Sequence, residues 1–369
     1  MKRSNTVKML LSLSAVLFML LCGCDVKKTV PEVPLSTLEH VYTPAVTDDP
    51  DAAVTPAPTV PPVAESPVTF LDINFEAAVR EAVGKQIGDI YPSDLQDLTS
   101  FSARVSGIMN IREISYFTSL EELDLMGNRI SDLTPVMSLK KLKKLNIAKN
   151  FSVMTGDSEK GLDISPLGAL PLLETLDASD NLITDVSSLG SMKKLKWLNI
   201  RTNRLTDLDG LEGCTSLEYL DVSGSYRIDR NNNSAGITDI SALSSLTSLK
   251  TLNMQNGLVG SLEPIAGLDR LEYVDATYNA LKTFPDMKQM KSLTTLIARS
   301  NNIYSLDGLA NNLTLKKVDV RDNFITSVWQ VISMPSLETI YLDGNPIIDY
   351  SPLDIIQAIK NLNYRADLY

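Results

Sequence analysis

The stretch Leu120-Glu-Glu-Leu-Asp-Leu-Met-Gly-Asn-Arg-Ile130 has the form L-x-x-L-x-L-x-x-N-x-I, and its opening leucine recurs along most of the 369-residue chain. Eight of the ten intervals between successive opening leucines are 22 residues long, and the other two are 31 and 32 residues long. Self-similarity at this period indicates a solenoid, in which no unit buries its apolar face alone and function resides on an extended repeated surface. The eleven opening leucines are Leu98, Leu120, Leu142, Leu173, Leu195, Leu217, Leu249, Leu271, Leu293, Leu315 and Leu337.

Each unit is predicted to contain a strand and a turn. Counted from the opening leucine, positions +3 and +5 are apolar between polar neighbours, which predicts a half-buried strand. Positions +13, +16 and +19 are apolar again, as in Leu133, Val136 and Leu139, and this spacing favours a short helical turn on the outer side. Asn312 is the one polar residue in the +19 column, where we expect a local weak point.

Asparagine fills position +8 in eight of the units. A buried amide at this position can bond to the backbone of the turn that follows the strand. Stacked copies therefore predict an asparagine ladder, interrupted at Ser106, Ser225 and Gly257. The ladder residues are Asn128, Asn150, Asn181, Asn203, Asn279, Asn301, Asn323 and Asn345.

This pattern resembles the leucine-rich repeat, specifically the short bacterial type of the internalin family. Residues 68–97 are similar to that family's helical N-terminal cap, because apolar residues recur at helical spacing between Phe70 and Val83. Residues 98–345 would hold the eleven repeats, and residues 346–369 would close the other end. The resemblance implies an α/β repeat solenoid: an arc with a parallel concave sheet, short 3-10 or loop segments on the convex side and a helical N-cap.

Residues 1–24 are predicted to be a secretory signal. Basic residues precede an apolar run from Met9 to Leu21, which is short for a membrane span. The run ends in Leu21-Cys-Gly-Cys24, which resembles a bacterial lipobox cleaved before Cys24. This resemblance implies a lipid on Cys24 and a surface lipoprotein on the extracytoplasmic face of a bacterial cell membrane. An ordinary signal peptide and an uncut membrane anchor remain alternatives.

Residues 25–67 are predicted to be a disordered tether. The segment contains nine prolines and shows no apolar periodicity, so it would hold the solenoid off the membrane. The single histidine of the chain, His40, lies in it. A Ser-His-Asp site or a histidine metal cluster in the folded domain is therefore excluded.

Charge and cysteine content limit the partners further. The net charge is -11, and removal of the three basic residues of the signal would leave -14, which argues against a nucleic-acid partner. Cys214 occupies the apolar +19 column and is expected to be a small buried hydrophobe. The motif Asp229-x-Asn231-x-Asn233 lacks the glycine and the closing acid of a calcium loop. We expect no cofactor, no metal site and a monomer.

Position +4 alternates between Asp and Asn over seven units: Asp124, Asn146, Asp177, Asn199, Asp221, Asn253 and Asp275. Like charges on neighbouring strands destabilise a sheet, so an interposed Asn that donates to both neighbours would separate the carboxylates by ~10 Å. That separation is longer than most paired-carboxylate sites need. We therefore favour a structural ladder over a glycosidase site and do not expect an enzyme.

An aromatic cluster marks the candidate binding face. Trp197 and Tyr219 are predicted on adjacent strands, with Tyr273 two strands further on and Tyr278 in the same unit. Aromatic residues on an open face are common anchors of protein or sugar contacts, although strands favour them anyway. Asp221 and Arg201 would supply polar contacts beside these rings.

Two long units interrupt the period. The extra residues lie in Phe151–Lys160 and Tyr226–Ala235, and both follow position +8, which predicts that both leave the same edge of the solenoid. Insertions on one side often build a binding surface, so Phe151 and Tyr226 are candidate contacts. Tolerated surface insertions are the alternative.

The sequence thus predicts a lipid-anchored extracytoplasmic protein that binds a protein ligand through its concave face and its loop-bearing edge. By resemblance to internalins, the ligand would lie at a cell surface. The alternatives are a carbohydrate-binding envelope module, which needs a flat platform of rings, and a recognition subunit of an envelope complex of the same cell.

Replacement of Cys24 by Ala is expected to release the protein from membranes, because the lipid attachment point is lost. Fractionation of cells that secrete each variant measures this. Cys22→Ala serves as the matched control, since Cys22 lies on the discarded side of the predicted cleavage point. Membrane retention of Cys24→Ala would rule out the lipid anchor.

Overall fold

The computed structural model describes residues 65–150, 161–228, 232–360 and 363–365, which belong to one compact unit. The predicted signal with Cys24, nearly all of the tether with His40, and the first insertion with Phe151 lie outside the described residues. As far as the described part of the chain extends, no helix has both the length and the apolar character needed to cross a membrane.

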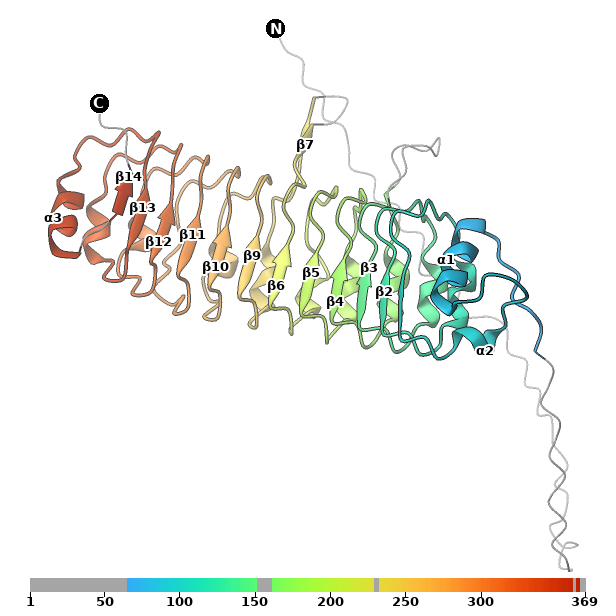
Figure 1. The fold of residues 1–369 in the computed structure, drawn as a ribbon. Helices are drawn as coiled ribbons and strands as arrows, with labels where there is room; N and C mark the ends of the chain where they lie inside the picture. Colours follow the sequence, from blue (N-terminus) through green and yellow to red (C-terminus); the bar gives the residue numbers. More distant parts are fainter. Residues whose placement is uncertain (1–64, 151–160, 229–231, 361–362, 366–369) are drawn as a thin grey trace, which may run out of the picture. The chain divides into compact units, whose positions relative to one another are not determined.

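Twelve short parallel strands form one sheet that runs along the solenoid (Figure 1). Eleven of them begin two residues after an opening leucine, as predicted. The twelfth strand, β14, comes from the C-terminal cap and extends the predicted arc by one strand. The strands are β1 (Ser100–Ser102), β2 (Glu122–Asp124), β3 (Lys144–Asn146), β4 (Thr175–Asp177), β5 (Trp197–Asn199), β6 (Tyr219–Asp221), β9 (Thr251–Asn253), β10 (Tyr273–Asp275), β11 (Thr295–Ile297), β12 (Lys317–Asp319), β13 (Thr339–Tyr341) and β14 (Asn363–Arg365).

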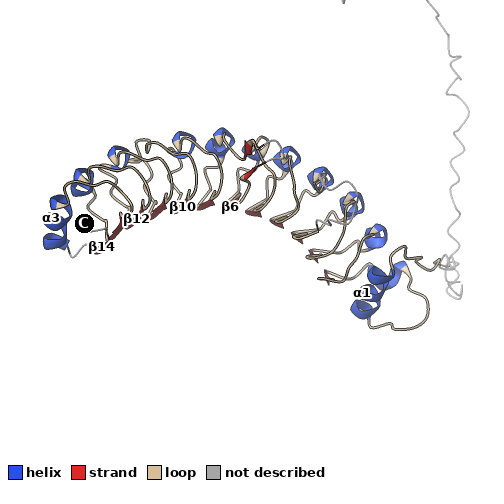
Figure 2. Cartoon of the chain, turned by 90° about the horizontal axis from the view of Figure 1, so that it is seen from above, coloured by secondary structure: helices blue, strands red, loops and turns tan. Residues whose placement is uncertain are grey.

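Short 3-10 helices occupy the outer side of the repeats, and the strands line the inner side (Figure 2). This confirms the predicted concave sheet and the 3-10 or loop convex side. In η2 and η3, proline stands in the first turn, where no backbone donor is lost. The 3-10 helices are η1 (Arg112–Tyr116), η2 (Thr134–Ser138), η3 (Ser165–Ala169), η4 (Ser187–Ser191), η5 (Leu211–Gly213), η6 (Ser241–Ser245), η7 (Glu263–Ile265), η8 (Asp307–Leu309) and η9 (Trp329–Ser333).

One continuous apolar core fills the space between the sheet and the 3-10 helices. Strand residues such as Leu198 and Ile200 are fully buried, and so are the leucines that open the repeats. Cys214 is also buried, and its thiol donates to the carbonyl of Leu189 at 3.1 Å. Burial raises the pKa of this thiol to about 11, so Cys214 is an inert core residue, as predicted.

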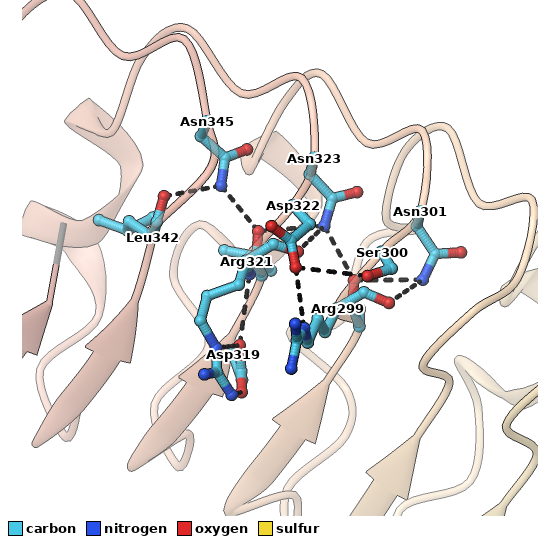
Figure 3. A network of polar contacts seen from close by, with 11 residues as sticks. Arg299, Ser300, Asn301, Asp319, Arg321, Asp322, Asn323, Leu342 and Asn345 are labelled. Atoms are coloured by element: carbon cyan, nitrogen blue, oxygen red, sulfur yellow. Dashed lines mark hydrogen bonds and ion pairs between the residues drawn. The ribbon is translucent and has the colours of Figure 1, made fainter. Parts of the chain in front are cut away.

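The asparagine ladder joins each repeat to the one before it. The Asn301 amide donates to the carbonyls of Ala298 in its own repeat, at 3.1 Å, and of Ala276 in the preceding repeat, at 2.9 Å. Its side-chain oxygen accepts from the backbone N–H of Leu281 at 3.0 Å. Asn323 and Asn345 repeat this arrangement (Figure 3). The ladder therefore satisfies backbone groups that the parallel strands leave unpaired.

The expected weak point at Asn312 is wrong. Its amide donates to the carbonyl of Met287 at 2.8 Å. Its oxygen accepts from the backbone N–H groups of Thr314 and Leu315 at 3.0 and 2.9 Å. The polar side chain is buried but hydrogen-bonded, and a buried polar group is costly only when it lacks partners.

The N-terminal cap contains two helices, α1 (Ile73–Val83) and α2 (Pro92–Leu95), within the predicted range of residues 68–97. Phe75 of α1 is fully buried and packs edge-on against Phe101 of the first strand, with ring centroids 5.8 Å apart. The cap thereby covers the open end of the core. At the other end, α3 (Ser351–Lys360) contacts η9 and buries Leu353 and Ile356.

Asp72 fastens this cap to the repeats. One carboxylate oxygen accepts from the backbone N–H groups of Asn74 and Phe75 at the start of α1. The other accepts from Met109 and Asn110 in the first repeat at 2.7 and 3.0 Å. Burial acts to raise the pKa of Asp72, but these four bonds outweigh it and hold the pKa below its usual value.

Replacement of Asn301 by Ala should destabilise the domain by on the order of 2 kcal/mol, because two buried carbonyls and one N–H lose their partner. Urea denaturation followed by circular dichroism measures the change. The neighbouring Asn302 is exposed, so Asn302→Ala is the control and should change stability by less than ~0.5 kcal/mol. Equal stability of the two variants would contradict the structural role of the ladder.

Candidate functional site

The candidate face lies at the centre of the concave sheet, on strands β5, β6, β9 and β10. The parallel register places Trp197, Tyr219, Thr251 and Tyr273 side by side in one row. All four side chains are half-buried, whereas the alternate strand residues point into the core. The predicted aromatic row is therefore present on the concave side.

Trp197 and Tyr219 stack on one another across neighbouring strands. Their ring centroids are 5.1 Å apart and the ring planes differ by 9°. Since the strands themselves are ~4.8 Å apart, the rings stand edge-on to the concave face rather than lying flat on it. Such a pair adds about 0.5–1.5 kcal/mol beyond its burial and holds both rings in place. The flat platform that carbohydrate stacking needs is not formed by this pair.

The Asp/Asn column mainly ends the strands. The side chains of Asp177, Asp221 and Asp275 each accept the backbone N–H of the residue two positions later, at 3.0 to 3.1 Å. The predicted amide-to-carboxylate bond between strands occurs from Asn199 to Asp177 at 3.2 Å. Asn253 donates instead to the Tyr219 hydroxyl at 3.3 Å, so the prediction that each Asn donates to both carboxylates is wrong.

Two tyrosine hydroxyls join this polar layer. The Tyr273 hydroxyl donates to Asp275 at 3.4 Å, and the amide of Gln255 donates to the same carboxylate oxygen at 2.8 Å. Burial, followed by the charge and hydrogen bond of Asp275, raises the pKa of Tyr273. Burial and the charge of Asp221 likewise raise the pKa of Tyr219. Both phenols therefore stay neutral well above pH 7.

Ion pairs neutralise the ends of the concave face but not its centre. Asp124 pairs with Arg104 at 3.5 Å, and Asp319 pairs with Arg321 at 2.5 Å. Within the described residues, no Lys or Arg forms an ion pair with the three carboxylates of the central strands, Asp177, Asp221 and Asp275. The predicted contact Arg201 is exposed at the end of β5. The centre of the face is thus aromatic and acidic.

A second charged row borders the face and was missed from the sequence. Position +1 alternates between Glu and Lys, and neighbouring strands pair these side chains, as in Lys196–Glu174 at 2.8 Å and Lys250–Glu218 at 2.6 Å. Both pairs are about half exposed, so each contributes little to stability, ~0.2–1 kcal/mol. The alternation of sign every 22 residues was the signal that could have revealed this row.

Tyr226 and Tyr278 lie beyond the strand ends, at the edge of the solenoid. Tyr226 precedes β7 (Arg227–Ile228), which pairs antiparallel with β8 (Ser234–Ala235). Figure 1 shows β7 projecting from the repeats. Both tyrosines are exposed, by 42% and 53%, so they form an edge surface separate from the stacked pair. The prediction that the Phe151–Lys160 insertion leaves the same edge stays a prediction.

Other features of the described residues offer little chemistry. A hollow of about 390 Å³ lies beside Asp163 and Asp185, but both carboxylates already accept the N–H of the following turn at 2.8 Å. No group of three His, Cys, Asp or Glu side chains is arranged to hold a metal ion in the part of the chain that the structure describes. The concave face is therefore the best candidate site.

The comparisons with known proteins agree with this architecture. A family model for leucine-rich repeats in two copies matches residues 171–211 and 193–234, which include β5 and β6. Internalins of Listeria monocytogenes are among the similar solved structures. The chain is a leucine-rich-repeat protein with the fold of the internalins. The matching family model describes a repeat and not a catalytic domain.

Three solved structures illustrate the likeness. An internalin (inlF) of Listeria monocytogenes is 23% identical with a TM-score of 0.54, covering 81% of this chain and 96% of that one. The functional domain of InlJ, also from Listeria monocytogenes, is 24% identical with a TM-score of 0.60, covering 81% and 60%. The plant peptide hormone receptor RGFR1, in complex with RGF2, is 22% identical with a TM-score of 0.54, covering 68% and 40%. No curated protein sequence matches this chain. At these identities the likeness shows the fold alone.

Replacement of Asp275 by Asn should lower the pKa of Tyr273 toward its usual value, because a nearby negative charge no longer opposes loss of the phenolic proton. NMR titration of the Tyr273 ring carbon attached to oxygen measures the shift. Asp124 occupies the same repeat position on β2, far from Tyr273, and Asp124→Asn should leave that pKa unchanged. An unchanged pKa in Asp275→Asn would contradict the described contact.

Proposed function

We propose that this internalin-like protein recognises a protein ligand through the concave face of its repeat domain, in adhesion or a related recognition role. The observation that carries the proposal is the stacked Trp197–Tyr219 pair, held beside carboxylates that have no cationic partner within the described residues. Buried aromatic anchors with adjacent polar groups dominate the binding energy of many protein interfaces.

The rigidity of the face supports the same proposal. The parallel register, the ring stack and the asparagine ladder fix the side chains before any ligand arrives. A preformed surface loses little conformational freedom on binding, and this saves free energy that a flexible surface would lose. Among the similar structures, the plant receptor is named as a complex with RGF2, a use of the same fold in recognition.

The loop-bearing edge would widen this interface. Tyr226 at the base of the β7–β8 hairpin and Tyr278 after β10 are exposed aromatic side chains on that edge. Arg227 ties the hairpin to the solenoid by donating to the carbonyl of Arg204 at 2.9 Å. We propose that a ligand seated on the concave face also contacts this edge, and that Phe151 adds to it.

We further propose that the domain works outside the cytoplasm, tied to the bacterial cell membrane by a lipid on Cys24. The support is the lipobox-like Leu21-Cys-Gly-Cys24 and the proline-rich residues 25–67 that follow it. A tether of this composition would allow the concave face to reach partners away from its own membrane.

A carbohydrate ligand is the less supported alternative. Sugars stack on the open faces of rings, and the facing sides of Trp197 and Tyr219 cover one another. A partner in the envelope of the same cell would use the same surface as a partner on another cell.

Placing the photo-crosslinking amino acid p-benzoylphenylalanine at Tyr219 should trap a protein ligand when the chain is exposed to envelope proteins or host extracts. The same amino acid at Trp329, an exposed residue of η9 on the convex side, is the matched control and should trap none. Mass spectrometry identifies what is trapped and whether it comes from the same cell.

The double variant Trp197→Ala, Tyr219→Ala should then lose capture of that ligand with an unchanged melting temperature, whereas Trp329→Ala should retain it. Capture that survives the double variant, or equal crosslinking from Tyr219 and Trp329, would remove the concave-face proposal. Binding to a glycan array in place of a protein would favour the carbohydrate alternative.

A further inference from the structure

A slot separates the two tyrosines of the aromatic row. Tyr219 and Tyr273 flank Thr251, whose short side chain leaves the space between the two rings open. Two strand spacings amount to ~9.6 Å. A flat group held between two rings needs ~7–8 Å, because each face-to-face contact spans ~3.5–4 Å. The slot can therefore hold one planar layer, whereas the 5.1 Å between the rings of Trp197 and Tyr219 leaves no room.

Carboxylates border this slot on the same face. Asp221 and Asp275 follow the two tyrosines by two residues and are only 9% and 6% exposed. Their described bonds come from backbone, hydroxyl and amide groups, such as Ser223 and Gln255, and not from a cation. An uncharged planar group in the slot would cover these charges without compensating them, which costs free energy.

The same sheet already contains the complementary arrangement, with the cation supplied by the chain itself. Arg321 donates to both oxygens of Asp319, at 2.9 and 2.5 Å (Figure 3). Its guanidinium also lies 5.2 Å from the ring centroid of Tyr341 on the neighbouring strand. This unit thus combines an Asp, a Tyr and an Arg on adjacent strands.

The slot lacks only the third of these components. Arginine occupies position +6 in three units, as Arg201, Arg299 and Arg321, but the three units that form the slot carry Ser223, Gln255 and Thr277 there. Asp221 and Asp275 therefore have the tyrosines that Asp319 has, without its arginine. Arg201 is the nearest chain cation on the row and stands one strand before Tyr219.

We propose that the protein ligand inserts an arginine side chain between Tyr219 and Tyr273, above Thr251, where Asp221 and Asp275 receive its guanidinium. This inference rests on the proposed function and names the chemistry of the partner, a protein segment with exposed arginine. The guanidinium fits better than an ammonium, because it is planar, stacks on rings and donates two parallel bonds to a carboxylate.

Peptides of six arginines, six citrullines and six lysines test the proposal on the full chain at physiological ionic strength. Citrulline keeps the shape of arginine without its charge, and lysine keeps the charge without the planar group. We expect the arginine peptide to bind about tenfold or more tightly than the citrulline peptide, and measurably more tightly than the lysine peptide. Fluorescence anisotropy of labelled peptides measures the affinities.

Thr251→Trp tests the slot itself, because a large ring would fill it without changing the charge of the protein. Binding of the arginine peptide should weaken about tenfold or more. Thr339→Trp is the matched control, since Thr339 has the same repeat position on β13 and the same half-buried environment. Thr251→Tyr replaces Thr251→Trp if the melting temperature of the latter falls.

Equal binding of the arginine and citrulline peptides, equal binding of the arginine and lysine peptides, or full binding by the Thr251 variant would each overturn the slot proposal. These outcomes are separate from failure of the proposed function, which is tested by crosslinking from Tyr219. A ligand that still crosslinks there while ignoring Thr251→Trp would retain concave-face recognition and discard the arginine.

Discussion

The fixed register between neighbouring repeats is the constraint on which the rest of this structure depends. Each ladder asparagine binds carbonyls of two repeats and accepts a backbone N–H from the earlier one, as Asn301 does with Ala298, Ala276 and Leu281. A repeat that slipped against its neighbour would leave these buried groups unpaired. Because the register is held from inside, the concave side chains need no contacts of their own to keep their spacing.

That spacing decides what the concave face can do. Neighbouring residues of one row are too close to admit a ligand group between them, so Trp197 and Tyr219 pack on each other. Residues two strands apart leave room for one layer, which is why the small side chain of Thr251 matters. The same geometry separates the carboxylates of the +4 column and makes the centre acidic without direct repulsion between neighbours.

The irregular part of the ladder coincides with the candidate face. Ser225 and Gly257 replace asparagine in the two units that carry Tyr219 and Thr251. The Ser225 hydroxyl keeps a weak bond to the carbonyl of Val222 at 3.4 Å, and the N–H of Tyr226 bonds to Asn256 at 2.8 Å. Backbone pairing thus partly replaces the missing amides where the β7–β8 hairpin leaves the solenoid.

The sequence alone determined the repeat, the strands, the buried columns, the ladder and the row to which each candidate residue belongs. A strict period guarantees this, since residues 22 positions apart fall on neighbouring strands. Only the tertiary structure decided how side chains within a row meet: the edge-on stack of Trp197, the choice of Asn253 to bond Tyr219, and the satisfied amide of Asn312. It also added β14, because pairing after the last repeat follows from where α3 returns the chain and not from the period. Periodicity specifies neighbours, whereas ring orientation and hydrogen-bond partners depend on distances that no pattern of letters contains.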